Sequence, residues 1–192
     1  MAPIILDFVV NGRVAGREGN RCAYTAPHNA YRCRGEDRWC TIAVFDDEEW
    51  EGFCKVIGSP SWTKDPKFSR LPARKQNEDE LDRLVEKWTT SHSAEEVMNM
   101  MQAAGVPAGL VQTGEDLLEK DPQLKHRHFF QELDHPEIGK HYARGPSFVL
   151  SRSPWLPQRC PLLGEHNEYV LKEVLGMSNE EIAELIIEGI LD

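Results

Sequence analysis

The sequence has no apolar run near the roughly 18–20 residues that a membrane-spanning helix needs, so we expect no membrane association. Its first apolar stretch, residues 4–10, is short, contains Asp7 and follows no basic residue, which indicates that it is not a signal peptide. Basic residues are also scarce: Lys and Arg number 22 against 32 Asp and Glu, for a net charge of −10. A general nucleic-acid-binding protein needs a basic surface, so this class is excluded.

Several motifs of catalysis and metal binding are missing as well. There is no G-x-S-x-G elbow, no G-x-x-x-x-G-K loop and no C-x-x-C pair. The five cysteines are odd in number, and a chain of 192 residues does not depend on disulfides, so we expect reduced thiols and a cytoplasmic protein. Four histidines lie close together, but their spacing matches no zinc pattern. We therefore predict no metal site, and surface or packing roles for His126, His128, His135 and His141.

The charge that is present is unevenly distributed. Residues 161–192 hold eight acidic side chains and one lysine, which is typical of a solvated helical face. Residues 1–40 hold six arginines and four acidic residues, so this part could meet an anionic ligand.

A dense charged turn lies within the arginine-rich part, at Gly35. Arg32, Arg34 and Arg38 surround it, and arginines near a turn can hold phosphates. A solvated hairpin end is the alternative, and composition favours it. Cys33 and Cys40 flank the same turn, and because free cysteine behaves as a small hydrophobe, we expect core or edge positions for both.

Residue patterns predict an α+β fold. Residues 29–34 and 38–45 are expected to form a hairpin, because the second run is rich in β-branched and aromatic residues. A helix should begin after Asp46, where Glu49 completes a capping-box pattern. Its apolar face follows the i, i+3, i+4, i+7 spacing and consists of Trp50, Phe53, Cys54 and Ile57.

The rest of the chain continues this α+β pattern. Residues 59–72 contain three prolines and are expected to form a loop. The further predicted elements are helices opening at Asn77 and Ser93, a strand at 106–111, a short helix from Thr113 that Pro122 breaks, strands within 129–150, a proline-rich linker at 151–161, a helix ending near Gly176, and a helix opening at Ser178 with Ile182, Leu185 and Ile186 inside.

Several short segments resemble one protein family in content and order. The C-terminal ones are 161–167, Pro-Leu-Leu-Gly-Glu-His-Asn, and 170–176, Val-Leu-Lys-Glu-Val-Leu-Gly. The others are Asn11-Gly12-Arg13, Gly19-Asn20-Arg21, Ala26-Pro27-His28, Tyr31-Arg32-Cys33-Arg34-Gly35, Asp46-Asp47-Glu48-Glu49-Trp50, Ala104-Gly105-Val106-Pro107-Ala108 and Asp121-Pro122-Gln123-Leu124. Together they resemble the family III CoA-transferases, which include formyl-CoA transferase, carnitine CoA-transferase and α-methylacyl-CoA racemase relatives.

The resemblance implies a particular domain organisation. Family members are longer and begin with a large Rossmann-like domain, which this sequence is expected to lack. We expect residues 1–28 to form a connecting segment and lid loop, and residues 29–150 a small α+β domain with a mixed sheet and flanking helices. Residues 151–192 would form a linker and returning helices that pack on the large domain. Two full-length chains of this family are expected to interlock as a dimer.

The resemblance also implies a chemistry. A family aspartate attacks the acyl-CoA thioester, and CoA is then carried as an aspartyl-CoA thioester to an acceptor carboxylate. None of Asp7, Asp37, Asp46 and Asp47 falls at that aspartate's position, so we expect no catalytic nucleophile in this chain. Coenzyme A is then a substrate, and no cofactor is implied.

The family's glycine-rich lid matches residues 22–28 of this sequence, but the glycines are missing. The predicted substrate-facing residues are Tyr24, Thr25, Ala26, Pro27 and His28. Pro27 should make the loop stiffer than a glycine loop, which puts formyl-CoA and oxalate specificity in doubt. His28 is the side chain that we expect to face the substrate.

Two functions remain open. The chain is either the C-terminal portion of an acyl-CoA:carboxylate CoA-transferase, inactive without a large-domain half, or a non-catalytic module that self-associates. A part of an acyl-CoA racemase is a variant of the first. In the second case, exposed apolar faces should drive oligomer formation.

Overall fold

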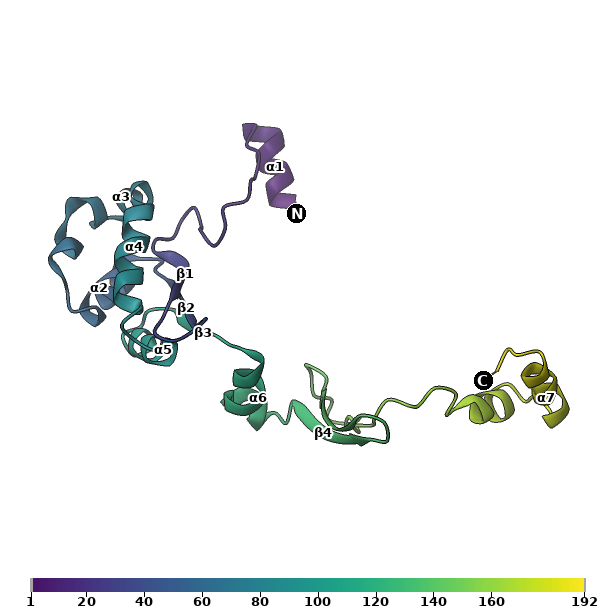
Figure 1. Cartoon of the computed structure of the whole chain (residues 1–192). Helices are drawn as coiled ribbons and strands as arrows, with labels where there is room; N and C mark the ends of the chain where they lie inside the picture. Colours follow the sequence, from purple (N-terminus) through teal and green to yellow (C-terminus); the bar gives the residue numbers. More distant parts are fainter. Residues whose placement is uncertain (1, 192) are drawn as a thin grey trace. The chain divides into compact units, whose positions relative to one another are not determined.

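The computed structural model describes residues 2–191. Met1, the first residue of the predicted connecting segment, and Asp192, the last residue of the predicted returning helices, lie outside the described residues. The chain divides into two compact units, Met1–Gln112 and Thr113–Asp192. Helices combine with two separate sheets, which confirms the predicted α+β class (Figure 1). The named strands within residues 2–191 all pair antiparallel, so the expected mixed sheet is wrong. The predicted division at residues 28 and 150 stays a prediction. No helix within residues 2–191 is long and apolar enough to cross a bilayer.

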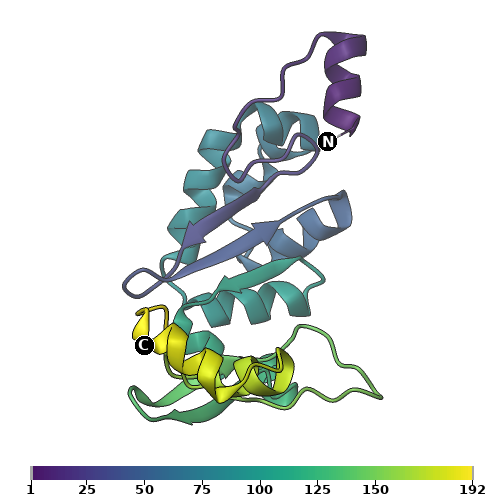
Figure 2. The same ribbon diagram turned by 90° about the vertical axis from the view of Figure 1, so that its right-hand side faces the viewer.

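A three-stranded sheet organises the first unit, in the order β1-β2-β3 (Figure 2). The predicted hairpin is confirmed as β1 (His28–Arg32) and β2 (Trp39–Ala43), with Tyr31 opposite Cys40. Strand β3 (Ala108–Val111) pairs antiparallel with β2 at the edge, directly after Pro107. That place suits proline, which cannot donate a main-chain hydrogen bond to a neighbouring strand.

Two helices of this unit begin where the capping patterns predict. Helix α2 (Asp47–Val56) starts at Asp46, whose carboxylate accepts the Glu49 main-chain N–H at 2.8 Å. Helix α5 (Ala94–Ala103) starts with a complete capping box between Ser93 and Glu96. Both caps satisfy main-chain N–H groups that have no partner inside the helix. At α2 the Glu49 carboxylate accepts the Phe45 N–H at 2.6 Å, so the predicted reciprocal box is complete only at α5.

The segment between these helices differs from the prediction. Residues 59–72 are not a plain loop, because they contain two 3-10 turns, η1 (Ser61–Lys64) and η2 (Pro66–Phe68), and the start of α3 (Leu71–Gln76). The Asn77 side chain does not cap α4 (Glu78–Thr89) but donates back to the Ala73 carbonyl at 2.9 Å. Asn77 thus connects two consecutive helices, α3 and α4.

The apolar core of the described chain lies in the first unit. The predicted face of α2 is confirmed, with Trp50, Phe53 and Ile57 buried and Cys54 half-buried. Helix α4 contacts β1, and α5 contacts β2 and β3. The fully buried residues include Ile42, Val44, Phe53, Leu81, Val85, Val97 and Met101.

The second unit is built from short elements. Its sheet is the hairpin of β4 (Phe130–His135) and β5 (Gly139–Arg144), and its turn lies where 135–139 predicts it. Pro122 does not only end a helical segment; it is in the first turn of α6 (Pro122–His126), a place that suits its fixed φ. The remaining elements are the π-helical turns η3 (Asp116–Lys120) and η4 (Tyr169–Val174), and α7 (Asn179–Ile187) with its predicted Ser178 cap.

Apolar side chains outside the first unit's core are largely uncovered. Within residues 2–191, every buried apolar residue lies between Ala26 and Val106. Helix α1 (Ala2–Asn11) is apolar on nearly all sides and buries none of its residues. A helix of that kind is stable in water only when another surface covers it. The predicted inner residues Ile182 and Leu185 are only half-buried, and Ile186 is exposed.

Candidate functional site

The predicted substrate-facing segment is mostly built into the first unit. Tyr24 is exposed, with 68% of its surface accessible. Thr25, Ala26 and Pro27 are buried, and His28 is half-buried at the start of β1. Only Tyr24 and His28 therefore present side chains to the surroundings.

Main-chain hydrogen bonds hold this segment against the sheet. The Ala26 N–H donates to the Val44 carbonyl at 3.3 Å, and the Val44 N–H donates to the Pro27 carbonyl at 3.0 Å. The Arg74 Nε donates to the Ala26 carbonyl at 2.9 Å. The Lys75 Nζ donates to the Cys22 carbonyl at 2.8 Å, at the beginning of the segment. These contacts anchor both ends of the exposed Tyr24 tip.

Arg74 is a fully buried cation in this anchor. Its Nη1 donates to the Phe68 carbonyl at 3.3 Å, and its guanidinium lies 4.6 Å from the centre of the Trp50 ring. Burial lowers the pKa of Arg74, and the nearby Asp47 carboxylate, 3.6 Å from Nη2, opposes that shift. Sequence patterns do not identify this residue, because its partners lie at Ala26, on η2 and on α2.

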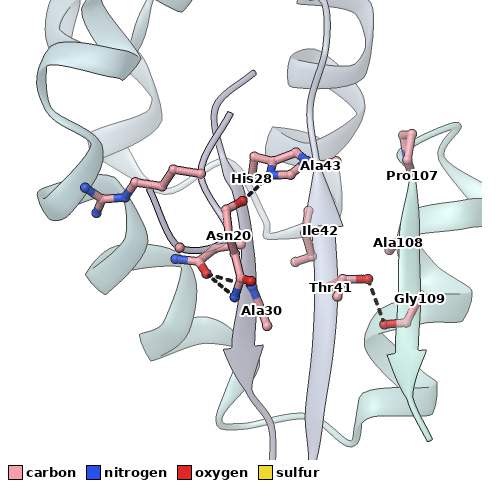
Figure 3. A pocket seen from close by; sticks show the side chains of 12 residues that line it. Asn20, His28, Ala30, Thr41, Ile42, Ala43, Pro107, Ala108 and Gly109 are labelled. Atoms are coloured by element: carbon pink, nitrogen blue, oxygen red, sulfur yellow. Dashed lines mark hydrogen bonds between the residues drawn. The ribbon is translucent and has the colours of Figure 1, made fainter. Parts of the chain in front are cut away.

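A depression of about 630 Å³ lies over the strands beside the anchored segment. Its lining residues come from the loop before β1 and from all three strands. Figure 3 shows them: Gly19, Asn20, Arg21, His28, Asn29, Ala30, Thr41, Ile42, Ala43, Pro107, Ala108 and Gly109. The His28 Nδ1 is hydrogen-bonded to the Asn20 main-chain carbonyl (Figure 3).

Asp82 on α4 holds the loop before β1 in place. Its carboxylate accepts hydrogen bonds from the Tyr31 hydroxyl at 2.7 Å, the Arg21 Nη2 at 2.9 Å and the Asn29 Nδ2 at 3.2 Å. Burial, followed by the charge of Asp82, raises the pKa of Tyr31, so this hydroxyl stays a donor. The helical spacing of apolar residues predicts only that Asp82 lies on the polar face of its helix. It does not predict that Asp82 links α4 to β1 and to the loop before β1.

Replacing Asp82 with Asn should destabilise the first unit by about 1.5–3 kcal/mol. The three partners are all donors, and the amide that replaces one carboxylate oxygen is a donor too. The measurement is urea unfolding followed by tryptophan fluorescence, since four of the five tryptophans lie in this unit.

Asp79→Asn is the matched control. Asp79 also accepts from Arg21, at 2.6 Å, which lowers its pKa, but its side chain is 81% exposed. Exposed ion pairs contribute little, so we expect a much smaller loss than in Asp82→Asn. Equal losses in the two variants would contradict the role assigned to Asp82.

The arginine turn has partners of its own. Arg34 Nη2 lies 3.2 Å from Glu96, and Arg38 Nη2 lies 2.9 Å from Glu95, both in the first turn of α5. The Arg32 guanidinium lies 5.0 Å from the centre of the Trp39 ring. These contacts support a hairpin end tied to α5 rather than a phosphate site.

Two of the cysteines lie in the core, and two of the histidines have ring contacts with each other. Cys33 and Cys40 are buried free thiols, as predicted for core cysteines, and burial raises the pKa of both. His135 and His141 face each other across the second hairpin with ring centres 6.1 Å apart. Across residues 2–191, no group of three or more His, Cys, Asp or Glu side chains is arranged to hold a metal ion.

The first unit is thus a small α+β unit in which residues 22–28 are anchored beside an open sheet face. The family model described as CoA-transferase family III matches residues 1–167. The chain therefore belongs to CoA-transferase family III, as its short segments predict.

Individual relatives agree with this assignment. The chain is 35% identical over 170 residues to a probable CoA-transferase of Mycobacterium tuberculosis, covering 87% of this chain and 21% of that protein. It is 32% identical over 184 residues to the formyl-CoA:oxalate CoA-transferase of Bradyrhizobium sp. (strain ORS 278), covering 94% of this chain and 43% of the relative.

Solved structures show the same relationship. A CAIB/BAIF family protein from Brucella suis matches with a TM-score of 0.75 at 25% identity, over 90% of this chain and 44% of that one. A Mycobacterium tuberculosis protein matches in fold, with a TM-score of 0.60 at 20% identity, over 86% of this chain and 50% of that one. The chain thus spans at most half the length of these relatives.

Proposed function

We propose that this chain forms the small-domain portion of an acyl-CoA:carboxylate CoA-transferase and works together with a large-domain half. The observation that carries this proposal is that no apolar residue is buried within residues 113–191, together with the uncovered helix α1. The Bradyrhizobium relative is more than twice as long, and we assign the covering of these surfaces to the part of such an enzyme that this chain does not match. Covering them removes apolar area from water, which stabilises the assembly by about 25 cal/mol per Å².

In this assembly the reaction is a transfer of CoA between carboxylates. An aspartate carboxylate outside this chain attacks the thioester carbonyl and expels CoA thiolate, which leaves a mixed anhydride. The thiolate then attacks the aspartyl carbonyl, releases the donor acid and forms an aspartyl-CoA thioester. The acceptor carboxylate then attacks the aspartyl-CoA carbonyl and expels CoA thiolate, which leaves a second mixed anhydride. The thiolate finally attacks the acceptor's carbonyl, which forms the acceptor's CoA thioester and releases the aspartate carboxylate.

The lid residues Tyr24–His28 are the part of this chain that we assign to the substrate. The tip at Tyr24 is exposed, while Ala26 is fixed by Val44 and Arg74. A fixed lid holds its shape without the mobility of a glycine loop. We assign it an acyl-CoA substrate.

A chimeric enzyme tests the proposal. The C-terminal part of the Bradyrhizobium formyl-CoA:oxalate CoA-transferase that matches this chain is replaced by residues 1–192, and CoA transfer is measured by mass spectrometry with a panel of carboxylates. We expect transfer by the chimera and none by the isolated chain.

Two outcomes contradict the proposal. Turnover of acyl-CoA by the isolated chain would show that the nucleophile lies within it. A chimera that folds and binds CoA but transfers none to any carboxylate would show that this chain has lost the family chemistry.

The isolated chain should self-associate through α1, and lysines on that helix should reverse this. Ile5 and Val9 are 59% and 72% exposed and lie one helical turn apart. We expect sedimentation velocity to show oligomers at micromolar concentration, and the Ile5→Lys/Val9→Lys variant to shift toward a 21.9 kDa monomer.

Asn99→Lys/Gln123→Lys provides the control, since it adds the same charge at exposed polar positions. This variant should remain oligomeric. A wild-type chain that sediments as a single 21.9 kDa species would contradict the prediction.

A further inference from the structure

Cys22 lies in a tight turn at the start of the anchored segment. It forms an isolated β-bridge with Thr25, whose main-chain N–H donates to the Cys22 carbonyl at 3.4 Å. The same carbonyl accepts the Lys75 Nζ at 2.8 Å. Cys22 is a half-buried free thiol, whereas Cys33 and Cys40 are buried. The main chain of Cys22 is therefore held in place while the residue keeps contact with solvent.

The Thr25 hydroxyl is positioned for an anion at the Cys22 sulfur. Thr25 is fully buried, and its Oγ1 has no hydrogen-bond partner within the part of the chain that the structure describes. A buried hydroxyl without a partner is costly, so it favours a state that supplies an acceptor. The group beside it is the Cys22 sulfur, which accepts only weakly as a thiol and strongly as a thiolate. The turn thus favours the ionised form of Cys22.

Further groups around the sulfur favour the same form. After the Thr25 hydroxyl, the Tyr24 main-chain N–H and hydroxyl donate to the sulfur, and the Lys75 charge attracts it. These contacts lower the pKa of the Cys22 thiol, whereas burial raises the pKa of Cys54 to about 11. The thiolate is the nucleophile in cysteine chemistry, and reactive cysteines combine such donors with a nearby cation and partial exposure. Cys22 therefore has the surroundings of a reactive thiol.

A cavity of about 500 Å³ beside Cys22 gives room for a group bound to the sulfur. Two of its lining residues are the direct neighbours of Cys22 in the chain, and a third donates to the Cys22 carbonyl. The cavity is lined by Glu18, Arg21, Ala23, Lys75 and Glu78. Its lining is thus mostly charged, which makes the charge of an incoming reagent decisive.

Carboxylates outnumber cations around this cavity. The carboxylates belong to Glu18, Glu78, Asp79 and Asp82, and the cations to Arg21 and Lys75. Both cations are already paired, and the Glu78 Oε1 is buried without a hydrogen-bond partner among the described residues. A protonated amine would compensate the excess negative charge, whereas a further carboxylate would add to it.

We propose that Cys22 is a modification site for small disulfides that carry a primary ammonium group, such as cystamine. The Cys22 thiolate attacks one sulfur of the disulfide, so that a new S–S bond forms and the old one breaks. Cys22 is oxidised, and the leaving half is reduced to an aminothiolate that takes up the proton lost from the thiol. The aminoethyl group that stays on Cys22 lies against the carboxylates of the cavity. This site is independent of the transferase role proposed above.

Reaction of the full 192-residue chain with two disulfides of similar length tests the site. Cystamine carries ammonium groups, and 3,3′-dithiodipropionate carries carboxylates in their place. Peptide mass spectrometry gives the rate at Cys22 and at Cys160, an exposed cysteine of the second unit. The ratio of the two rates cancels the intrinsic reactivity of each reagent.

We expect Cys22 to react with cystamine roughly 5–10-fold faster than Cys160 at neutral pH. With the dicarboxylate this ratio should fall about 3-fold or more, and the difference between reagents should shrink at high salt, because ions screen charges. Equal rates at the two cysteines would overturn the proposal. A ratio that is the same for both reagents would overturn the assigned chemical class.

Two variants of Thr25 test the buried hydroxyl. Thr25→Val removes it at nearly unchanged size and should slow the reaction at Cys22 roughly 3–10-fold, the effect of one hydrogen bond. Thr25→Ser keeps a hydroxyl and should react within a factor of about 2 of the wild type. Cys160 should be unaffected in both variants.

Circular dichroism separates a lost contact from a lost fold. A folded Thr25→Val variant with an unchanged rate at Cys22 would contradict the role of the hydroxyl. If Thr25→Val does not fold, the ratios measured on the wild-type chain still decide the proposal.

Discussion

Replacing Arg74 with Met should destabilise the first unit by about 2–4 kcal/mol. The methionine fills similar space but leaves the buried main-chain carbonyls of Ala26 and Phe68 without their donor, and it removes the cation from the Trp50 ring. Loss of the desolvation cost of a buried charge offsets part of this. Urea unfolding followed by tryptophan fluorescence measures the change.

Arg70→Met is the matched control, because Arg70 is an exposed arginine one helical turn earlier. We expect it to change the free energy of unfolding by less than about 0.5 kcal/mol. Hydrogen exchange should also become faster at Ala26 in Arg74→Met, since the hydrogen bond to its carbonyl is lost. An Arg74→Met variant as stable as Arg70→Met would show that the buried guanidinium contributes no net stability.

The elements that are predicted correctly from the sequence are those whose positions depend on residues close to one another in the chain. The hairpin of β1 and β2 follows from β-branched residues around a turn, and α2 and α5 follow from capping residues and apolar spacing. Local prediction fails at residues 59–72 and at Asn77. There, tertiary contacts around Arg74 and a side-chain bond to Ala73 determine where helices begin.

The candidate site likewise contains residues that the sequence predicts and residues that it does not. Resemblance points to His28, and its neighbour Asn20 is only eight residues away. The groups that hold the site are distant in sequence: Arg74 lies 48 residues from Ala26, and Asp82 lies 53 from Asn29. No periodicity or spacing connects such pairs, because the packing of helices on the sheet brings them together.

Gly52→Ala should destabilise the first unit by about 1–3 kcal/mol, although alanine favours a helix more than glycine does. A methyl group at Gly52 in α2 would lie 2.7 Å from the Ala104 main-chain oxygen and 3.2 Å from Val106 Cγ2. The oxygen belongs to the end of α5, where the Val106 N–H donates to the Met101 carbonyl at 2.9 Å, so the main chain cannot easily move. The contact between α2 and α5 must therefore open, which exposes core residues such as Phe53 and Met101.

Gly114→Ala separates this clash from the general effect of adding a methyl group, because nothing lies within 4 Å of the position that its Cβ would take. We expect that variant to be as stable as the wild type or slightly more stable. Adding Val106→Ala to Gly52→Ala relieves the side-chain contact but leaves the 2.7 Å contact with the Ala104 oxygen, so stability should not recover. Recovery in the double variant would show that side-chain crowding, not the approach of two main chains, requires glycine at this position. Near-wild-type stability of Gly52→Ala itself would show that α2 and α5 are less closely packed than the structure indicates.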